Sequence, residues 1–328
     1  MTHTVSRSFA ELLSADRGRT PLSPYQSDEE FERLWDAALA RVASFPAGLV
    51  ATLADFRLKG NGCGALLLRG FPVDHAVLGP TPAHFADEVE RHEAWRAAEW
   101  LLAVSSVLGE VFAFQRQHNG ALVQNMVPVE DDAYTQKGTG SRVFLEWHNE
   151  DPYDQLRADY IALGCLRSDP AAQTALVYAD DVPLAARTVR ILAQPRFHVG
   201  IDLASGGTGV VEEGPVIAIL AHDEAGRRLV RLDTDLVAAA AGDAEADAAL
   251  TELREALPEA ARHVTLEAGD VLIIDNRRTL HGRTAYSPNF DGTDRWLQRV
   301  SIAADITLSA PYRTRRPRAI DVEARNFG

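Results

Sequence analysis

Apolar side chains recur at two different spacings along this chain, and the change between them predicts where helices give way to strands. From Glu29 to Ser44 they recur every three or four residues, which is typical of a helix with one buried face. Ser27 and the acidic residues after it supply a helix start. The same period returns over residues 82–108, with tryptophans on the expected core side. We therefore expect residues 1–60 and 82–108 to be largely helical.

Short apolar runs separated by Gly, Pro and Asp dominate the chain from about residue 121. Such runs are typical of buried strands. The predicted strands, including an earlier one closed by a turn, are 64–69, 121–127, 157–166, 174–178, 216–221, 229–232, 271–275 and 297–303. A helix is predicted over 243–257, and the Ala- and Asp-rich segment 238–249 is interpreted as a helical or loop insertion.

This order of elements indicates a mainly β fold with helical additions. Several antiparallel strands predict a double-stranded β-helix, or jelly roll, whose two sheets pack face to face and are buttressed by N-terminal and insertion helices. We expect one domain over residues 1–328, with helical support in 1–60 and the jelly-roll core in about 61–310. The polar loop 128–142 is a candidate lid, and an ordinary flexible connection is the alternative.

Composition and charge narrow the possible partners. The chain has 47 acidic and 33 basic residues, and its net charge of −14 disfavours a nucleic-acid partner. The basic run 313–318 is interpreted as a solvated tail or a source of internal ion pairs. Cys63 and Cys165 have no metal or disulfide spacing, and no apolar run of 18 residues occurs. We therefore expect a cytoplasmic protein without a membrane partner.

Three residues offer the ligand set of a non-haem Fe(II) site. In the segment 147–151, strand alternation would place His148 and Glu150 on one side of the chain. His281 follows the predicted strand 271–275 and would have to come from a strand that returns alongside the first. Two imidazoles and one carboxylate can hold Fe(II) on one face of an octahedron and leave the other three positions open.

A further residue places this motif in a family context, because Arg295 lies 14 residues after His281. The whole arrangement resembles the clavaminate synthase-like branch of the Fe(II)/2-oxoglutarate-dependent dioxygenases, over about residues 60–310. That branch includes hydroxylases of free arginine, lysine and asparagine, among them the viomycin-pathway arginine hydroxylase type. The resemblance implies Fe(II), 2-oxoglutarate as cosubstrate, and O2.

The resemblance also implies a role for each residue of this site. His148, Glu150 and His281 would be the catalytic metal ligands. Arg295 would bind the far carboxylate of 2-oxoglutarate, because a planar guanidinium suits a carboxylate better than an ammonium does. The Thr174 hydroxyl would assist at the same carboxylate. The alternatives are a structural ion pair for Arg295 and a β-forming role for Thr174.

The substrate end carries a pair of acids. Alternation predicts that Asp233 and Asp235 share one face of a strand, and adjacent carboxylates repel unless a cation or proton lies between them. The resemblance implies that they hold a substrate guanidinium. It also implies Arg299 for the substrate carboxylate, with Gln124 and Glu150 for the ammonium. Gln115, Gln117 and Asn125 compete with Gln124 for that role.

These expectations describe an enzyme that hydroxylates the β or γ carbon of a free cationic L-amino acid, most closely L-arginine, in specialised metabolism such as antibiotic biosynthesis. L-Lysine is the next candidate, followed by asparagine, citrulline and enduracididine, and desaturation stays open. A carboxylate at Glu150 favours hydroxylation over halogenation. Asp233 and Asp235 could instead form ion pairs with the local arginines 227, 228 and 231.

Two other classes of protein remain as alternatives. A non-catalytic jelly-roll binding protein would use the same scaffold without turnover. A zinc hydrolase could use the same three ligands, but it would leave Arg295 without a role. His118 is interpreted as a loop residue, with a place near the pocket as the alternative, and the other histidines lack the spacing of a second metal site. The sequence leaves the oligomeric state open.

Overall fold

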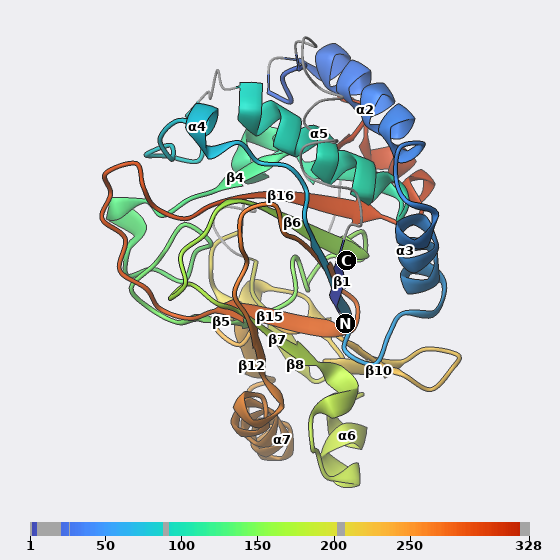
Figure 1. The fold of residues 1–328 in the computed structure, drawn as a ribbon. Coiled ribbons are helices and arrows are strands. Elements are labelled where there is room, and N and C mark those ends of the chain that lie inside the picture. Colours follow the sequence, from blue (N-terminus) through green and yellow to red (C-terminus); the bar gives the residue numbers. More distant parts are fainter. Residues whose placement is uncertain (1, 5–20, 26, 88–91, 202–206, 322–328) are drawn as a thin grey trace.

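The computed structural model describes residues 2–4, 21–25, 27–87, 92–201 and 207–321. Predictions for residues 5–20 and 88–91 lie outside these ranges. Figure 1 shows helices above a main sheet, a second sheet beneath it, and two further helices beyond the second sheet. The helices are α2 (Asp28–Val42), α3 (Ala47–Lys59), α4 (His75–Leu78), α5 (His92–Ser106), α6 (Ala186–Leu192) and α7 (Ala244–Ala256).

The main sheet has eight strands, in the order β1-β2-β14-β6-β16-β3-β17, with β4 also paired to β16. Its central pairs, β2–β14, β14–β6 and β6–β16, are antiparallel. The strands are β1 (Thr2–Thr4), β2 (Ala65–Arg69), β3 (Glu110–Phe114), β4 (Gln124–Met126), β6 (Tyr160–Arg167), β14 (Val271–Asp275), β16 (Trp296–Ala303) and β17 (Ala319–Ile320).

The second sheet has four strands in the order β13-β7-β15-β5. Its strands are β5 (Leu145–His148), β7 (Thr174–Tyr178), β13 (Arg262–Val264) and β15 (Thr279–Arg283). A three-stranded sheet and a hairpin adjoin it, made by β8 (Phe197–Val199), β9 (Val216–Ile217), β12 (Val237–Ala239), β10 (Leu220–His222) and β11 (Arg228–Val230). Short 3₁₀ turns lie at Gln117–Gly120, Glu130–Asp132, Ala179–Asp181, Val211–Glu213, Pro258–Ala260 and Ile306–Tyr312.

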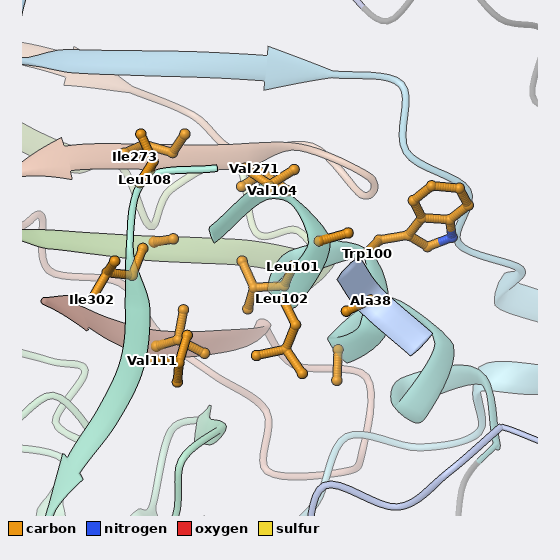
Figure 2. Close-up of a cluster of buried hydrophobic side chains, with 14 of the residues drawn as sticks. Ala38, Trp100, Leu101, Leu102, Val104, Leu108, Val111, Val271, Ile273 and Ile302 are labelled. Carbon is orange, nitrogen blue, oxygen red and sulfur yellow. The ribbon is translucent and has the colours of Figure 1, made fainter. Parts of the chain in front are cut away.

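Alternation along the strands sorts apolar side chains into two layers. On β14, Val271 and Ile273 belong to the buried cluster that packs against the helices, which Figure 2 shows together with Trp100, Leu101 and other residues of α5. Leu272 and Ile274 point the other way, into a cluster that includes Leu176 of β7. The two sheets therefore face each other across an apolar layer. The fold is mainly β, with helices added outside it.

Several predicted elements are confirmed. Helix α2 begins after Ser27, whose hydroxyl accepts a hydrogen bond from the Glu30 amide at 3.1 Å. The strands predicted at 174–178 and 271–275 have the observed bounds, and α7 lies within the predicted helix 243–257. Trp95 and Trp100 are buried as expected. Burial of the apolar face and local capping therefore account for the elements that the sequence pattern predicts.

Other predictions are wrong in part. Residues 2–4 form a strand that pairs in parallel with β2. Residues 82–87 form turns before α5, and the run predicted as one strand at 216–221 is divided between β9 and β10. Residues 237–239 form β12 rather than part of an insertion, because they pair with β8. For residues 2–4 and 237–239, pairing with a distant segment, which local spacing does not record, decided the outcome.

Within the described ranges, no single helix is both long and apolar enough to cross a bilayer. One bent pair, α2 with α3 at 114°, satisfies the length and composition test together.

Candidate active site

The two predicted histidines meet where β5 and β15 pair. His148 is the last residue of β5 and His281 lies directly opposite it on antiparallel β15. Their ring centroids are 4.3 Å apart. The expectation that the distant histidine would come from a strand returning alongside the first is therefore confirmed.

Glu150 reaches the same point by a different route from the one predicted. Strand β5 ends at His148, so alternation along a strand does not explain the direction of Glu150. Its backbone is held instead by Asn276, which accepts from the Glu150 amide at 2.9 Å and donates to its carbonyl at 3.1 Å. Asn149 turns away and donates to the backbone carbonyls of Asn276 and Thr279. A buried amide network therefore aims the carboxylate.

The three side chains present a set of donor atoms that fits a metal ion. Glu150 Oε1 lies 3.8 Å from His148 Nε2 and 3.4 Å from His281 Nε2. Neighbouring ligands in an octahedron are about 3 Å apart when each lies about 2.1 Å from the ion. His148 Nδ1 contacts the Glu146 carbonyl at 2.8 Å, which leaves Nε2 available as a ligand. Within the described residues, this is the one group of three or more His, Cys, Asp and Glu side chains with such geometry.

The charges at this point are strongly coupled. Burial raises the pKa of Glu150, but the charge of Arg299 and the two imidazole hydrogen bonds outweigh it and hold that pKa well below its usual value. Burial and the neighbouring His148 lower the pKa of His281 to about 4, so this ring is neutral near pH 7. Burial also acts to lower the pKa of His148, but the Glu150 hydrogen bond and charge raise it to about 9. A bound cation would displace that proton.

A cavity of about 520 Å³ opens beside the three donor atoms. Its lining includes eight of the residues assigned a role from the sequence: His148, Glu150, Thr174, Asp233, Asp235, His281, Arg295 and Arg299. Residues 135–139 of the candidate lid loop form part of the wall. A cavity of this size with charged groups on its wall suits a small, polar ligand.

Arg295 is a buried cation without a partner in the described part of the chain. It lies just before β16, is 8% exposed and lines the cavity beside Thr174. No hydrogen bond or ion pair joins its guanidinium to another described residue, so the structural ion pair considered from the sequence is absent there. Burial lowers its pKa. A buried guanidinium facing a cavity is a strong site for a carboxylate.

Arg299, four residues further along, has a partner at each of its three guanidinium nitrogens. Its Nε and Nη2 donate to Gln124 Oε1 at 2.9 and 2.7 Å, and its Nη1 donates to Glu150 Oε1. Gln124 does not line the cavity; it stands behind Arg299 and lines a neighbouring cavity of about 420 Å³. This differs from the ammonium-binding position expected for Gln124. Gln117, a competitor in the sequence, does line the main cavity.

The acid pair lies in a turn, and the prediction that it shares a strand face is wrong. Asp233 makes an isolated bridge opposite His148, and the Asp235 amide donates to Asp233 Oδ1 at 3.0 Å. Asp235 is exposed, whereas Asp233 is partly buried. Both side chains still line the cavity because the Thr234 amide ties the turn to the Trp147 carbonyl on β5.

The local arginines do not neutralise this pair. Arg227 donates to Asp223, Arg228 donates to the backbone carbonyls of residues 179 and 182, and Arg231 donates to the Pro152 carbonyl. Within the residues that the structure describes, neither Asp233 nor Asp235 has an ion-pair partner. The structure therefore does not contain the alternative in which Asp233 and Asp235 pair with these arginines.

Sequence reasoning missed several residues of the cavity wall. His118 lines the cavity, and its Nε2 lies 3.5 Å from Arg299 Nη2, so of its two interpretations the place near the pocket agrees with the structure. Asp151, in a left-handed conformation with φ 54°, accepts from Gln117 and Tyr153 at 2.5 and 2.7 Å. Arg283 lies two residues after His281 on β15, where alternation could have identified it.

The basic run 313–318 forms internal ion pairs, which is one of the two interpretations made from the sequence. Arg316 pairs with Asp28 of α2, and Arg318 pairs with Glu32 and Glu110. These ion pairs join the end of the described chain to the first helix and to β3.

Comparisons with known proteins agree with this geometry. Residues 20–301 match the family model described as taurine catabolism dioxygenase TauD, TfdA family. An L-asparagine oxygenase of Streptomyces coelicolor is 38% identical over 314 residues, covering 94% of this chain and 92% of the relative. An enduracididine beta-hydroxylase of Streptomyces hygroscopicus is 31% identical over 273 residues, covering 76% of this chain and 80% of the relative.

Solved structures extend the likeness to nearly the whole chain. The non-haem iron oxygenase OrfP, crystallised with Fe, succinate and (3S)-hydroxy-L-Arg, superimposes with a TM-score of 0.83 at 28% identity. The match covers 98% of this chain and 99% of that one.

Proposed function

We propose that this chain, which belongs to the taurine catabolism dioxygenase TauD, TfdA family, hydroxylates a side-chain β or γ carbon of free L-arginine or a close cationic analogue. Its relatives and structural neighbours are non-haem iron, 2-oxoglutarate-dependent oxygenases that act on amino acids, so the chain is an amino acid oxygenase of that type. Its cofactors are Fe(II), 2-oxoglutarate and O2. The identity of the amino acid is the part of the proposal that needs its own argument.

His148, Glu150 and His281 would hold the iron. Their donor atoms already surround one point, and His148 keeps Nε2 available because its Nδ1 contacts a backbone carbonyl. When bound, the iron and 2-oxoglutarate supply the oxidative chemistry, in which O2 converts the cosubstrate to succinate and CO2 and a hydroxyl group enters the substrate. The chain's own residues provide binding, orientation and charge.

Arg295 would bind the far carboxylate of 2-oxoglutarate, assisted by the Thr174 hydroxyl. Arg295 is buried and unpaired among the described residues, and Thr174 on β7 is 3% exposed beside the same cavity. An anion there would neutralise a cation that is otherwise buried without compensation. This pairing gives Arg295 the function that a zinc hydrolase would leave unexplained.

Arg299 would orient the α-carboxylate of the amino acid, and Glu150 would accept from its ammonium group as well as hold the metal. One N–H of Arg299 Nη1 remains beyond the bonds to Gln124, Glu150 and His118. We assign Gln124 to the orientation of Arg299, because its carbonyl oxygen accepts two hydrogen bonds from that guanidinium. Gln117 replaces it as the glutamine nearest to a substrate.

The observation that carries the choice of substrate is the unpaired acid pair. Asp233 and Asp235 line the cavity, and the nearby arginines that could have neutralised them bind elsewhere. Burial raises the pKa of Asp233, although the neighbouring His148 opposes this. A planar guanidinium can bond to both carboxylates at once, which an ammonium does less well. L-Lysine therefore ranks second among cationic substrates.

Turnover of free amino acids tests this choice. The purified protein, supplied with Fe(II) and 2-oxoglutarate, would be compared on arginine, lysine, enduracididine, citrulline and asparagine by succinate release and by mass of the product. We expect arginine to have the highest kcat/KM. Asp233→Asn and Asp235→Asn should each lower it, Asp233→Asn by roughly 30- to 100-fold, or about 2–3 kcal/mol. Asp247→Asn, on the exposed side of α7, is the matched control. Unchanged arginine turnover in both site variants would exclude the guanidinium role.

L-Asparagine is the second candidate, because an asparagine oxygenase is 38% identical over most of the chain. An amide side chain is neutral and needs a donor as well as an acceptor, whereas the acid pair offers only acceptors when ionised. If asparagine is the substrate, Asp233→Asn should lower the turnover of asparagine far less than the roughly 30- to 100-fold expected for arginine. The protein should then form no hydroxylated product from arginine.

The organisation of the whole chain remains a prediction. We interpret the two facing sheets as a jelly-roll core, residues 1–328 as a single catalytic domain, and the loop 128–142 as its lid. A cytoplasmic location and a role in antibiotic biosynthesis are predictions of the same kind.

A further inference from the structure

Arg283 connects the strand that carries His281 to the loop over the cavity. It lies two residues beyond His281 on β15, is 4% exposed and lines the cavity with Arg295. Residues 128–142, named the cover loop below, run from the end of β4 towards β5 and form part of the same wall. Nothing in the metal or substrate assignments above uses Arg283.

The Arg283 guanidinium bonds to three backbone carbonyls around the end of the cover loop. Nη1 donates to Gly140, Nη2 donates to Val143 at 3.1 Å, and Nε donates to Thr284 at 3.2 Å. Nearby, the Tyr286 amide donates to the Ser141 carbonyl at 2.9 Å, and its ring lies 5.2 Å from the Arg283 guanidinium carbon. The far end of the loop is therefore attached to β15 through a single side chain and one adjacent backbone bond.

The cover loop has a second attachment at Gln136, which donates to the Phe144 carbonyl at 2.9 Å and accepts from the Glu146 amide of β5 at 3.0 Å. Asp132 accepts from Lys137 and Thr139, both at 2.6 Å, and the Ala133 carbonyl accepts from the amides of residues 141 and 142. These internal bonds hold the shape of the loop. Gln136 ties its middle to β5, whereas its attachment to β15 depends on the contacts of Arg283 and Tyr286.

Burying a cation in this position is costly. Within the described residues no carboxylate lies within ion-pair distance of Arg283, and its acceptors are all neutral carbonyls. Burial lowers the pKa of Arg283 to about 10; Tyr286 opposes this, and the charge of Arg295 adds the smallest effect, a further lowering. A guanidinium has five N–H groups in one plane and can reach three separate carbonyls, which an ammonium on a lysine stem cannot do in that geometry. The geometry, rather than an ion pair, accounts for an arginine here.

We propose that Arg283 is a positioning residue that fastens the cover loop to β15 and thereby closes the cosubstrate end of the cavity. The attachment itself stands on the contacts above; its consequence for 2-oxoglutarate rests on the proposed function. Loss of the attachment would let the loop open while the sheets stay intact.

The lysine content of the chain gives a direct measurement of loop opening. Lys59 and Lys137 are the only lysines in the sequence, so a lysine-specific endoprotease has two cleavage sites, one after α3 and one in the cover loop. In the native protein without added ligands we expect slow cleavage after Lys137. Arg283→Gln and Arg283→Met, which add no lysine, should raise that rate about tenfold, because protease attack follows the population of the open form. The rate after Lys59 should not change. Arg228→Met, which alters an arginine bonded to backbone carbonyls away from the cavity and adds no lysine, is the matched control.

Turnover supplies a second readout that a merely structural role would not move. In the Arg283 variants the KM for 2-oxoglutarate should rise more than the KM for the amino acid, and more succinate should form per hydroxylated product. Equal cleavage after Lys137 in native protein and Arg283→Met would overturn the proposal. So would a parallel rise after both lysines, since that indicates general unfolding. If the native protein turns over none of the amino acids, the proposed function fails, and the cleavage rates still decide the role of Arg283.

Discussion

The two ends of the cavity are built in different ways. At the inner end, His281 and Arg295 are both 8% exposed, and Glu150 is aimed by a fully buried Asn276. At the outer end, Asp233 and Asp235 lie in a turn, and Asp235 is exposed. Sheet pairing and buried amide bonds fix the inner end, whereas a turn can change its residues without disturbing either sheet. Under the proposed function, the metal-binding end is held by the sheets and the amino acid is selected at the end that is built by a turn.

Removing a ligand should break the inner end with the largest effect. In His281→Ala we expect Fe(II)-dependent succinate release to fall by at least about 10³-fold, because two ligands cannot hold the ion in the required geometry. His222→Ala, an exposed residue of β10, is the control. Iron-dependent turnover at the native rate in His281→Ala would contradict the metal site.

Arg295→Ala should have the next largest effect on turnover. Loss of a buried, two-pronged carboxylate contact is expected to raise the KM for 2-oxoglutarate about 100-fold, or about 2.7 kcal/mol, with the KM for the amino acid little changed. Arg295→Lys should recover part of the loss, since it restores the charge without the planar geometry. A rise confined to the KM for the amino acid would indicate that Arg295 binds the amino acid instead of 2-oxoglutarate.

The outer end can be tested through charge alone, using arginine and its neutral analogue citrulline. In the native protein we expect kcat/KM to favour arginine by roughly 30-fold or more, because the acid pair lacks a cation with citrulline. In Asp233→Asn the ratio should fall towards one, and the difference gives the coupling between that carboxylate and the guanidinium. Equal kcat/KM values for the two amino acids in the native protein would remove the electrostatic basis of the substrate assignment.

The smallest effect is expected between the two ends, at Gln124. Gln124→Leu removes the acceptor for two N–H groups of Arg299 and should raise the KM for the amino acid by roughly five- to tenfold, or about 1–1.4 kcal/mol. The KM for 2-oxoglutarate should stay the same, since Arg295 does not contact Gln124. An equal rise in both constants would indicate a general disturbance of β16 instead of a loosened Arg299.

Local spacing predicted well those elements whose environment is set by burial. The helix at α2, the helix at α7 and the strands β7 and β14 were all readable, because a buried stripe or a continuous apolar run has one stable solution. Residues 2–4 and 237–239 were not, because each becomes a strand by pairing with a partner far away in the sequence.

The same division runs through the site. His148, Glu150 and His281 were identified from residue type and spacing, and the role of Arg295 from the resemblance to the dioxygenase branch. The path of Glu150 and the turn at Asp233 were not predictable, because the side chain of Asn276 and the pairing of residue 234 with Trp147 set them. Alternation from His281 could have placed Arg283 at the cavity, but the contacts that Arg283 and His118 make there depend on the tertiary structure.

The amino-acid sequence alone thus specified which ligand types are present and which chemistry they can support. The tertiary structure decided where each side chain points, which arginine is paired and which is not, and how the cover loop is attached. The physical reason is that a donor atom's identity is local, whereas its direction and its neutralisation depend on hydrogen bonds and charges contributed by segments more than a hundred residues away.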